Sequence, residues 1–262
     1  MPSVAALSGK RALLCGLGAL GSSTALELAR NGVGRLDVID FDYVEPATTR
    51  RWVAGLEEFG KEKTEAVEDV IRRNYPWTKV EPHRIRIGGL RPSPDTDDQF
   101  DQIAELVGAT DLVVDMTAEV TANHIIADMA AWASKPYMLA NATPGAWGGM
   151  VFQVRPDRED ACWMCMRAFL YPDSDNLPVT DPDGLIHPPG CAARTFSGTS
   201  FDLAEIVEEA MRAICGILGS EYPVTEWQLG ICDLRSPDGK RIPPHWRGLE
   251  ITRRKGCACL KS

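Results

Sequence analysis

The sequence predicts a doubly wound α/β fold, in which helices pack on both faces of a mainly parallel sheet. Residues 11–15 form an apolar run of strand length, a glycine-rich turn follows at once, and a helical pattern begins behind the turn. Strand-like and helix-like segments then alternate up to about residue 154. In such a fold ligands bind at the carboxyl ends of the strands, so functional residues are expected there.

The glycine-rich turn has the spacing G-x-G-x-x-G and is formed by Gly16, Gly18 and Gly21. Helical spacing of apolar residues continues to an Asn-Gly stop, and a second apolar strand then ends on Asp40. Glycines let the backbone approach a phosphate closely, and the start of the helix offers unpaired N–H groups. The carboxylate of Asp40 can accept hydrogen bonds from a ribose. The unit therefore predicts a Rossmann-like nucleotide site.

The residues after Asp40 favour a triphosphate over a dinucleotide. The chain does not enter another strand–helix unit at once, but passes Asp42 and reaches Arg51 and Lys63. Basic side chains beside a phosphate-binding turn suit the charge of a triphosphate. A nicotinamide-dependent oxidoreductase stays open as an alternative, although no hydride-transfer site is recognisable in the sequence.

The composition fits one α/β domain with a buried core, because the chain has 262 residues, 44% of them apolar, and a net charge of −9. The acidic balance argues against a nucleic-acid partner. No apolar stretch approaches the ~18 residues of a membrane span and the N-terminus lacks a signal pattern, so we expect a cytoplasmic protein without a membrane partner. In that compartment eight cysteines favour metal binding or thiol chemistry over disulfides.

The remaining elements of the first half follow from apolar periodicity and turn residues. The apolar strand that ends on Asp115 is typical of a central strand buried on both faces. The expected elements are, in order, a helix over 60–75, a strand over 79–87, an exposed loop over 88–98, a helix ending at 103–107, a strand over 112–115, a helix over 125–133, and strands over 136–140 and 150–154.

The second half changes character and is predicted to be partly antiparallel. The segment 171–193 is rich in Pro and Asp and has almost no periodicity, so we expect a long loop of functional importance. An amphipathic helix is expected over 201–218. Two strands follow at 227–234 and 249–252, with a turn at 236–239 and the Pro243-Pro244 segment between them.

Two pairs of cysteines have the spacing of a metal site. Cys162 and Cys165 form a C-x-x-C pair, and Cys257 and Cys259 form a C-x-C pair far along the chain. Four thiolates of this kind can bind one tetrahedral zinc ion (Zn2+), which would staple the second half together. A redox pair or idle surface thiols stay open as alternatives. The cysteines of apolar strands and helices are expected in the core, namely Cys15, Cys215 and Cys232.

The chain closely resembles the ThiF/MoeB family of adenylating enzymes, whose fold is shared with ubiquitin-activating enzymes. The family motif reads roughly GxGGLG…(V/I)DxDxVExSNLxRQ…GxxK. The resemblance covers nearly the whole chain and implies one adenylation domain over 1–262, with a nucleotide-binding half (1–154) and a half (155–262) that holds a crossover loop, a helix and the zinc site. The residues in register with the motif are Gly16, Gly18, Gly21, Asp40, Asp42, Val44, Glu45, Arg51 and Lys63.

The resemblance implies ATP-dependent adenylation of the C-terminal carboxylate of a ubiquitin-like or sulfur-carrier protein. The glycine turn would lie under the phosphates, and Asp40 would hold the ribose. Arg51 and Lys63 would stabilise the charge that develops as pyrophosphate leaves, and magnesium (Mg2+) would accompany the nucleotide. The family habit further implies a structural zinc and a homodimer, and leaves a conjugating enzyme open as a further partner.

One motif departs from the family pattern at a catalytic position. The family sequence DCTDN reads DMTAE here, from Asp115 to Glu119, so Ala118 replaces the aspartate that contacts magnesium. Asp115 or Glu119 could take over that role, and Asp115 is counted among the expected catalytic residues. A non-catalytic partner of the same fold stays open because of Ala118. Trp52 stands where the family often has Gln, and packing is favoured for it over stacking on a ligand.

A lone cysteine, Cys191, lies where relatives that form thioesters or persulfides carry a reactive cysteine. Its neighbours His187 and Arg194 could favour the thiolate. The resemblance therefore implies that the acyl-adenylate passes to Cys191 as a thioester. In relatives that only adenylate, a cysteine at this place has no covalent role, and that alternative stays open.

Overall fold

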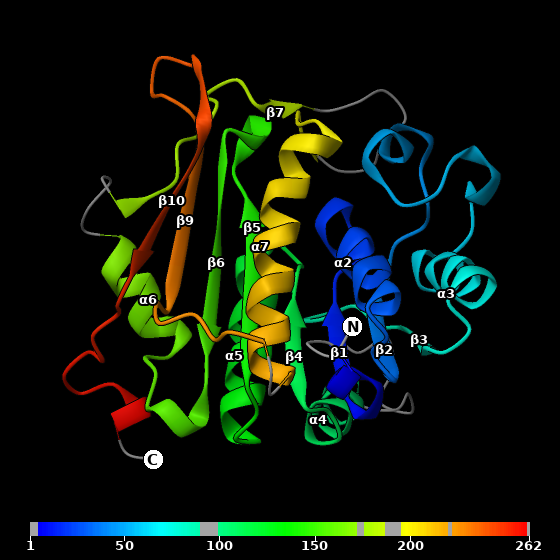
Figure 1. Ribbon diagram of the computed structural model, residues 1–262, viewed down its shortest axis with the longest axis horizontal. Coiled ribbons are helices and arrows are strands. Elements are labelled where there is room, and N and C mark those ends of the chain that lie inside the picture. Colours follow the sequence, from blue (N-terminus) through cyan, green and yellow to red (C-terminus); the bar gives the residue numbers. More distant parts are fainter. Residues whose placement is uncertain (1–4, 90–98, 172–175, 187–194, 220–221, 261–262) are drawn as a thin grey trace.

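The computed structural model describes residues 5–89, 99–171, 176–186, 195–219 and 222–260. An eight-stranded sheet runs through the molecule in the order β10-β9-β6-β5-β4-β1-β2-β3 (Figure 1). Neighbouring strands from β5 to β3 in this order pair in parallel, as predicted for the first half. These strands are β1 (Arg11–Cys15), β2 (Arg35–Asp40), β3 (Lys79–Arg84), β4 (Leu112–Asp115) and β5 (Tyr137–Ala142).

The second half extends the same sheet with antiparallel strands. β6 pairs with β5 and with β9, and β9 pairs with β10, each time antiparallel. The mainly parallel sheet with a partly antiparallel second half is therefore confirmed. The added strands are β6 (Gly148–Val154), β9 (Leu229–Arg235) and β10 (Arg241–Leu249), and a separate small sheet joins β7 (Leu185–Ile186) to β8 (Thr195–Phe196).

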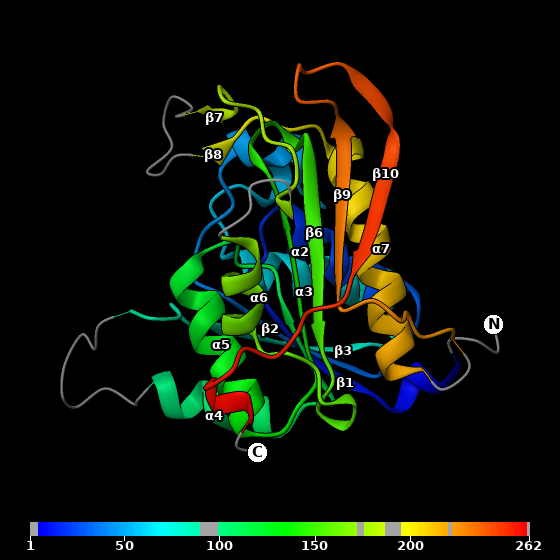
Figure 2. The same ribbon diagram turned by 90° about the vertical axis from the view of Figure 1, so that its left-hand side faces the viewer.

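Helices cover both faces of the large sheet, as Figure 2 shows for α7 on one side and α5 with α6 on the other. One hydrophobic core lies under α2 (Ala19–Arg30), α3 (Lys63–Asn74) and α7 (Ser200–Leu218). The second core lies under α4 (Gln99–Gly108), α5 (Val120–Trp132) and α6 (Trp163–Leu170). Within the described ranges, no helix combines the length and apolarity that crossing a membrane requires.

The central strand β1 shows why the apolar pattern specifies this layered fold. Leu14 points into the core under α2, whereas Leu13 and Cys15 point into the core under α5, and all three are fully buried. Successive side chains of a strand face opposite sides of the sheet, so a strand covered on both faces must be apolar at every position. An unbroken apolar run of strand length therefore predicts a central strand.

The edge strand β10 corrects the strand expected at 249–252, which was wrong. β10 spans Arg241–Leu249 and includes the Pro243-Pro244 segment, where the register against β9 shifts between Arg241 and His245. Proline is tolerated in an edge strand or at a bulge, because its missing N–H then breaks no ladder bond. Proline also keeps an exposed edge from pairing with another chain. The opposite edge strand, β3, likewise contains a proline, Pro82.

The first turn of α5 is a second difference from the expectation. The helix expected over 125–133 begins at Val120, because the side chain of Glu119 accepts a hydrogen bond from the Ala122 amide and caps the helix.

Short 3-10 helices occupy several connections, at Ala6–Gly9, Pro46–Arg51 (η2), Leu56–Glu58 (η3), Pro144–Ala146, Pro156–Arg158 and Ala258–Leu260.

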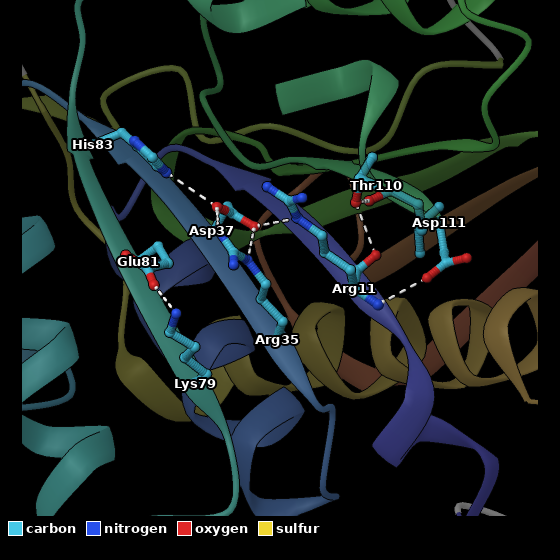
Figure 3. Close-up of polar contacts among 9 residues, drawn as sticks. Arg11, Arg35, Asp37, Lys79, Glu81, His83, Thr110 and Asp111 are labelled. Atoms are coloured by element: carbon cyan, nitrogen blue, oxygen red, sulfur yellow. Dashed lines mark hydrogen bonds and ion pairs between the residues drawn. The ribbon is translucent and has the colours of Figure 1, made fainter. Parts of the chain in front are cut away.

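A charged cluster joins β1, β2 and β3 (Figure 3). Asp37 is 1% exposed, and its oxygens lie 2.6 Å from Arg11 Nε, 3.1 Å from Arg35 Nε and 3.1 Å from His83 Nε2. Burial alone would raise the pKa of Asp37, but hydrogen bonds from His83, Arg35 and Arg11 outweigh it and hold this pKa well below its usual value. One carboxylate thus ties three strands together.

Candidate nucleotide site and metal centre

The glycine turn after β1 is shaped by close backbone contacts that only glycine permits. Gly16 has φ +88°, and a Cβ at this residue would lie 2.8 Å from backbone atoms of Met116 and Thr117. A Cβ at Gly21 would lie 1.8 Å from the carbonyl oxygen of Gly16. Side chains cannot be placed at such distances, so these two glycines bring β1, β4 and α2 together.

Gly18 has a different role from its two neighbours. A Cβ at Gly18 would meet nothing within 4 Å, so the space beside this residue is open. Gly18 is also the N-cap of α2 and supplies no side-chain hydrogen bond to the first turn. The start of α2 therefore has no side-chain cap and lies beside open space, and a helix N-terminus of this kind can bind phosphate.

Asp40 and Trp52 hold the backbone of this turn. Asp40, at the end of β2, accepts hydrogen bonds from the Leu17 amide at 2.6 Å and from the Asp42 amide at 2.8 Å. The indole Nε1–H of Trp52 donates to the Leu17 carbonyl at 2.8 Å. Trp52 is 8% exposed and belongs to the core under α2, so the expected packing role of this residue is confirmed.

The segment from Asp42 to Lys63 leaves the sheet and returns beside its starting point. The Lys63 amide donates to the Asp42 carbonyl at 3.0 Å, and the Val44 amide donates to the Lys61 carbonyl at 2.9 Å. Lys63 is 8% exposed, and its Nζ lies 2.8 Å from Asp42 Oδ2. Arg51 ends η2 within this segment, and burial lowers the pKa of its guanidinium. The closed segment therefore returns Lys63 to the end of β2.

These groups line one cleft of about 850 Å³. The cleft also reaches the ends of β3 and β4, and four carboxylates lie on its walls, those of Asp40, Asp42, Glu45 and Glu119. Gly21 does not line it, because this glycine serves the packing of α2 instead. The other predicted nucleotide-binding residues all do, namely Gly16, Gly18, Asp40, Asp42, Arg51 and Lys63.

The rim of the cleft contains two pairs of residues that the sequence reasoning did not single out. The Arg86 guanidinium lies 5.0 Å from the ring centre of Phe41, and that of Arg84 lies 4.9 Å from the ring centre of Tyr43. Cation–π contacts of this kind give the rim flat, polarisable surfaces. The available sequence signal is the alternation of arginine with isoleucine over 84–87, which by itself indicates only a strand.

Asp115, at the end of β4, is fully buried and lies outside the walls of the cleft. Its two oxygens accept hydrogen bonds from Thr117, Asn123 and Tyr137 at 2.8–3.0 Å. Burial, the largest influence, raises the pKa of Asp115. The carboxylate therefore holds the turn after β4 in place, and the catalytic role expected for it stays a prediction.

The turn after β4 brings Ala118 and Glu119 to the cleft. Ala118 has φ +54°, in the left-handed region where alanine is strained and Asn, Asp or Gly is favoured. Glu119 Oε2 accepts a hydrogen bond from the Ala122 amide at 2.7 Å, so this carboxylate already caps α5. Burial would raise the pKa of Glu119, but hydrogen bonds from the first turn of α5 outweigh it and lower this pKa.

The four paired cysteines come together between the start of α6 and residues 257–259. Their sulfurs all lie within 4.8 Å of one another. The nearest Sγ–Sγ distances are 3.5 Å for Cys162–Cys257, 3.7 Å for Cys165–Cys259 and 3.8 Å for Cys162–Cys165. A tetrahedron with Zn–S bonds of about 2.3 Å has edges of about 3.8 Å, so the four thiols fit zinc. The C-x-C spacing does not prevent the fit.

Three of the remaining four cysteines lie outside the cluster. Cys15, Cys215 and Cys232 are buried, as expected for core thiols. Burial raises the pKa of Cys232 to about 12, which makes its thiol inert at neutral pH. Cys191 and its neighbours His187 and Arg194 lie outside the described residues.

The sequence profile of the ThiF family matches residues 2–225, so the chain belongs to the ThiF family. The uncharacterized protein y4oA of Sinorhizobium fredii is 37% identical over 99% of the chain, and the probable adenylyltransferase/sulfurtransferase MoeZ of Mycobacterium tuberculosis is 30% identical over 80% of it. Among solved structures, Escherichia coli MccB, crystallised with MccA, is similar with a TM-score of 0.71 over 98% of this chain and 68% of that one, at 15% identity. This last likeness shows the fold. The chain spans 44% of y4oA and 49% of MoeZ.

Proposed function

We propose that the chain uses ATP to adenylate a carboxylate, and that this carboxylate is the C-terminus of a ubiquitin-like or sulfur-carrier protein. One observation carries the proposal. The uncapped start of α2 at Gly18, the acid Asp40, and the cations Arg51 and Lys63 all line one cleft at the carboxyl ends of the parallel strands. Family membership and the adenylyltransferase named among the relatives support the same reaction.

The reaction needs positive charge where pyrophosphate leaves. A carboxylate oxygen of the substrate attacks the α-phosphorus of ATP, a new O–P bond forms, and the bond to the bridging oxygen breaks with its electrons passing to pyrophosphate. Arg51 and Lys63 face that developing charge from the cleft wall. Asp42, whose Oδ2 lies 2.8 Å from Lys63 Nζ, orients the lysine before the nucleotide enters.

The cleft also offers the chemistry that magnesium requires, since this hard cation prefers carboxylate oxygens and phosphate. Asp42, Glu45 and Glu119 are the carboxylates that would hold it, with Asp40 reserved for the ribose. Magnesium, when bound, neutralises charge on the phosphates. Ala118 offers no ligand at the position where the family has aspartate, so Glu119 or Asp42, which also line the cleft, would replace it.

We further propose that Cys162, Cys165, Cys257 and Cys259 hold a structural zinc. The observed Sγ–Sγ distances of 3.5–3.8 Å match the edges of a zinc–thiolate tetrahedron. The Arg254 amide lies 3.2 Å from Cys165 Sγ, and an N–H group at this distance stabilises a thiolate. The ion would fasten the C-terminal segment to α6, far from the chemistry in the nucleotide cleft.

The proposal includes a second step at Cys191, in which the thiolate attacks the acyl-adenylate carbon, a thioester forms and AMP leaves. A Cys191→Ala variant should then lose a reducible adduct with the carrier while it keeps the adenylation step. An adduct that persists in this variant assigns the covalent role elsewhere. A homodimer, a cytoplasmic location and a conjugating enzyme as further partner belong to the same proposal.

The test is exchange between ATP and labelled pyrophosphate, measured with and without a panel of ubiquitin-like and sulfur-carrier proteins. We expect exchange that depends on one of these carriers and on magnesium. A second candidate, a non-catalytic partner subunit, is favoured by the missing carboxylate at Ala118. Binding of ATP and carrier without any exchange would support that candidate and reject the adenylation proposal.

A further inference from the structure

Both backbone polar groups of Leu17 are fixed by hydrogen bonds from or to side chains. The Leu17 amide donates to Asp40 Oδ2 at 2.6 Å, and the Leu17 carbonyl accepts from the indole Nε1–H of Trp52 at 2.8 Å. Leu17 lies between the two glycines whose backbone shapes the turn, and it is itself fully buried. The two bonds therefore clamp the middle of the phosphate-binding turn from opposite sides.

Both clamps belong to segments that carry other groups of the site. Asp40 ends β2, and Trp52 directly follows Arg51 at the end of η2. The bond from Trp52 to Leu17 therefore also fixes the backbone of Arg51 relative to the turn.

The Trp52 indole is placed to fix the glycine turn, and not to bind the ligand directly. Trp52 is one of the residues that line the cleft, but it is only 8% exposed and packs in the core under α2, so little of its surface can touch a ligand. Its single N–H is already used by the Leu17 carbonyl. Without this donor the carbonyl would be a buried acceptor with no partner, and the turn would have to move to find one.

We propose that Trp52 is a positioning residue for ATP, whose indole N–H holds the glycine turn and Arg51 in the arrangement that accepts the triphosphate. The inference rests on the proposed function, and it assigns to Trp52 a role distinct from filling the core. Loss of the N–H should then weaken binding of ligands with phosphates more than binding of the nucleoside, because adenosine has no phosphate for the start of α2 to bind.

Two variants of the full chain separate positioning from packing. Trp52→Phe keeps a large apolar ring and loses the N–H, whereas Trp52→Gln keeps an N–H donor and fills the core poorly. If the hydrogen bond matters, Phe should weaken ATP binding about tenfold and adenosine binding less than about threefold, and Gln should retain more ATP affinity than Phe. If only packing matters, the order of the two variants reverses.

Trp77 offers a matched control. Its indole Nε1–H donates to the Ala29 carbonyl at 2.8 Å, and neither residue lines the cleft. Trp77→Phe should leave both affinities unchanged. Dissociation constants for magnesium-ATP and adenosine would be measured by calorimetry well below the melting temperature of each variant, so that a change in stability does not enter.

The outcomes distinguish the inference from the function on which it rests. A wild-type chain that binds ATP, together with a Trp52→Phe variant that binds it equally well, overturns the inference and leaves the proposed function standing. An equal loss for ATP and adenosine also overturns it. A wild-type chain that binds no ATP overturns both.

Discussion

The nucleotide cleft and the cysteine cluster differ in what holds their functional groups in place. In the cleft, hydrogen bonds within the protein hold the functional groups. Asp40 and Trp52 fix the glycine turn, and Asp42 fixes Lys63. The turn after β4 is likewise fixed by the hydrogen bonds to Asp115. The protein itself therefore sets the positions of these groups, which favours electrostatic stabilisation of a leaving group.

The cysteine cluster gathers four sulfurs within 4.8 Å, and weak sulfur hydrogen bonds link them. Burial raises the pKa of Cys162, whereas hydrogen bonding, first of all from the Cys259 backbone, lowers the pKa of Cys257 to about 7. The zinc ion proposed above would complete such a group. The cleft should therefore keep its structure without a nucleotide, whereas the cysteine cluster should lose its structure when the metal ion is removed.

The largest effect is expected when a cation of the cleft is removed. Lys63→Ala and Arg51→Ala should each lower carrier-dependent ATP–pyrophosphate exchange about 10²–10³-fold, because each deletes a charge that we propose stabilises the leaving pyrophosphate. Their neighbours Lys61 and Arg50 do not line the cleft, so Lys61→Ala and Arg50→Ala serve as controls with near wild-type exchange. Equal effects for neighbours and cleft residues would contradict the assignment.

Removal of the ion should have the next largest effect, on stability. Chelation, or the Cys257→Ser change, should lower the zinc content from one per chain and the melting temperature by about 10 °C, because the binding energy of the ion is part of the folding energy. Cys215→Ala disturbs a buried thiol without touching the cluster and should keep the zinc. A folded wild-type protein without metal by elemental analysis would reject the site.

A smaller effect is expected at the charged cluster of β1, β2 and β3, which lies apart from both sites. Asp37→Asn should lower the free energy of unfolding by about 2 kcal/mol at pH 7, because it weakens hydrogen bonds to charged partners around a buried carboxylate. The exposed Lys79–Glu81 pair gives the control, since Glu81→Gln should cost less than about 0.5 kcal/mol.

The pH dependence of this effect follows from the lowered pKa of Asp37. The stabilisation is complete above the pKa of an unfolded aspartate, about 4, and is lost as the pH falls below that value. Urea unfolding of wild type and Asp37→Asn should therefore converge in acid. A difference that stays constant down to pH 3 would show that the charge of Asp37 does not contribute.

The smallest effect is expected at Ala118. Its φ of +54° strains alanine, so Ala118→Gly should raise the free energy of unfolding by about 1 kcal/mol. The same change inside α5, Ala127→Gly, should lower it by about 1 kcal/mol, because glycine is unfavourable in a helix interior. Thermal or urea unfolding measures the free energy of both variants. If both changes shifted it in the same direction, the strained backbone assigned to Ala118 would be contradicted.

Much of the cleft and of the cysteine cluster could be predicted because their signals are local. The glycine spacing, the acid at the end of β2 and the cysteine pairs each follow from a few neighbouring residues whose chemistry admits few alternatives. Central strands such as β1 could be predicted for the same reason, since burial on both faces leaves an unbroken apolar run.

What could not be predicted depends on distant pairing. The bond from Trp52 to Leu17 and the cluster around Asp37 exist only once strands and loops meet in a given register. β10 was missed because a Pro-Pro pair normally breaks a strand, and only its place at the edge of the sheet makes the pair acceptable. The sequence gives no signal for the strain at Ala118, because an alanine does not indicate a positive φ.

The most direct test of the central claim asks which nucleotide the cleft binds. Thermal unfolding of the chain would be followed with magnesium-ATP and with NAD+, for the wild type and for Lys63→Ala. We predict that ATP raises the melting temperature of the wild type, that NAD+ does not, and that the Lys63→Ala variant loses the response to ATP. A response to NAD+ in place of ATP, or an ATP response that Lys63→Ala leaves unchanged, would contradict a triphosphate site in this cleft.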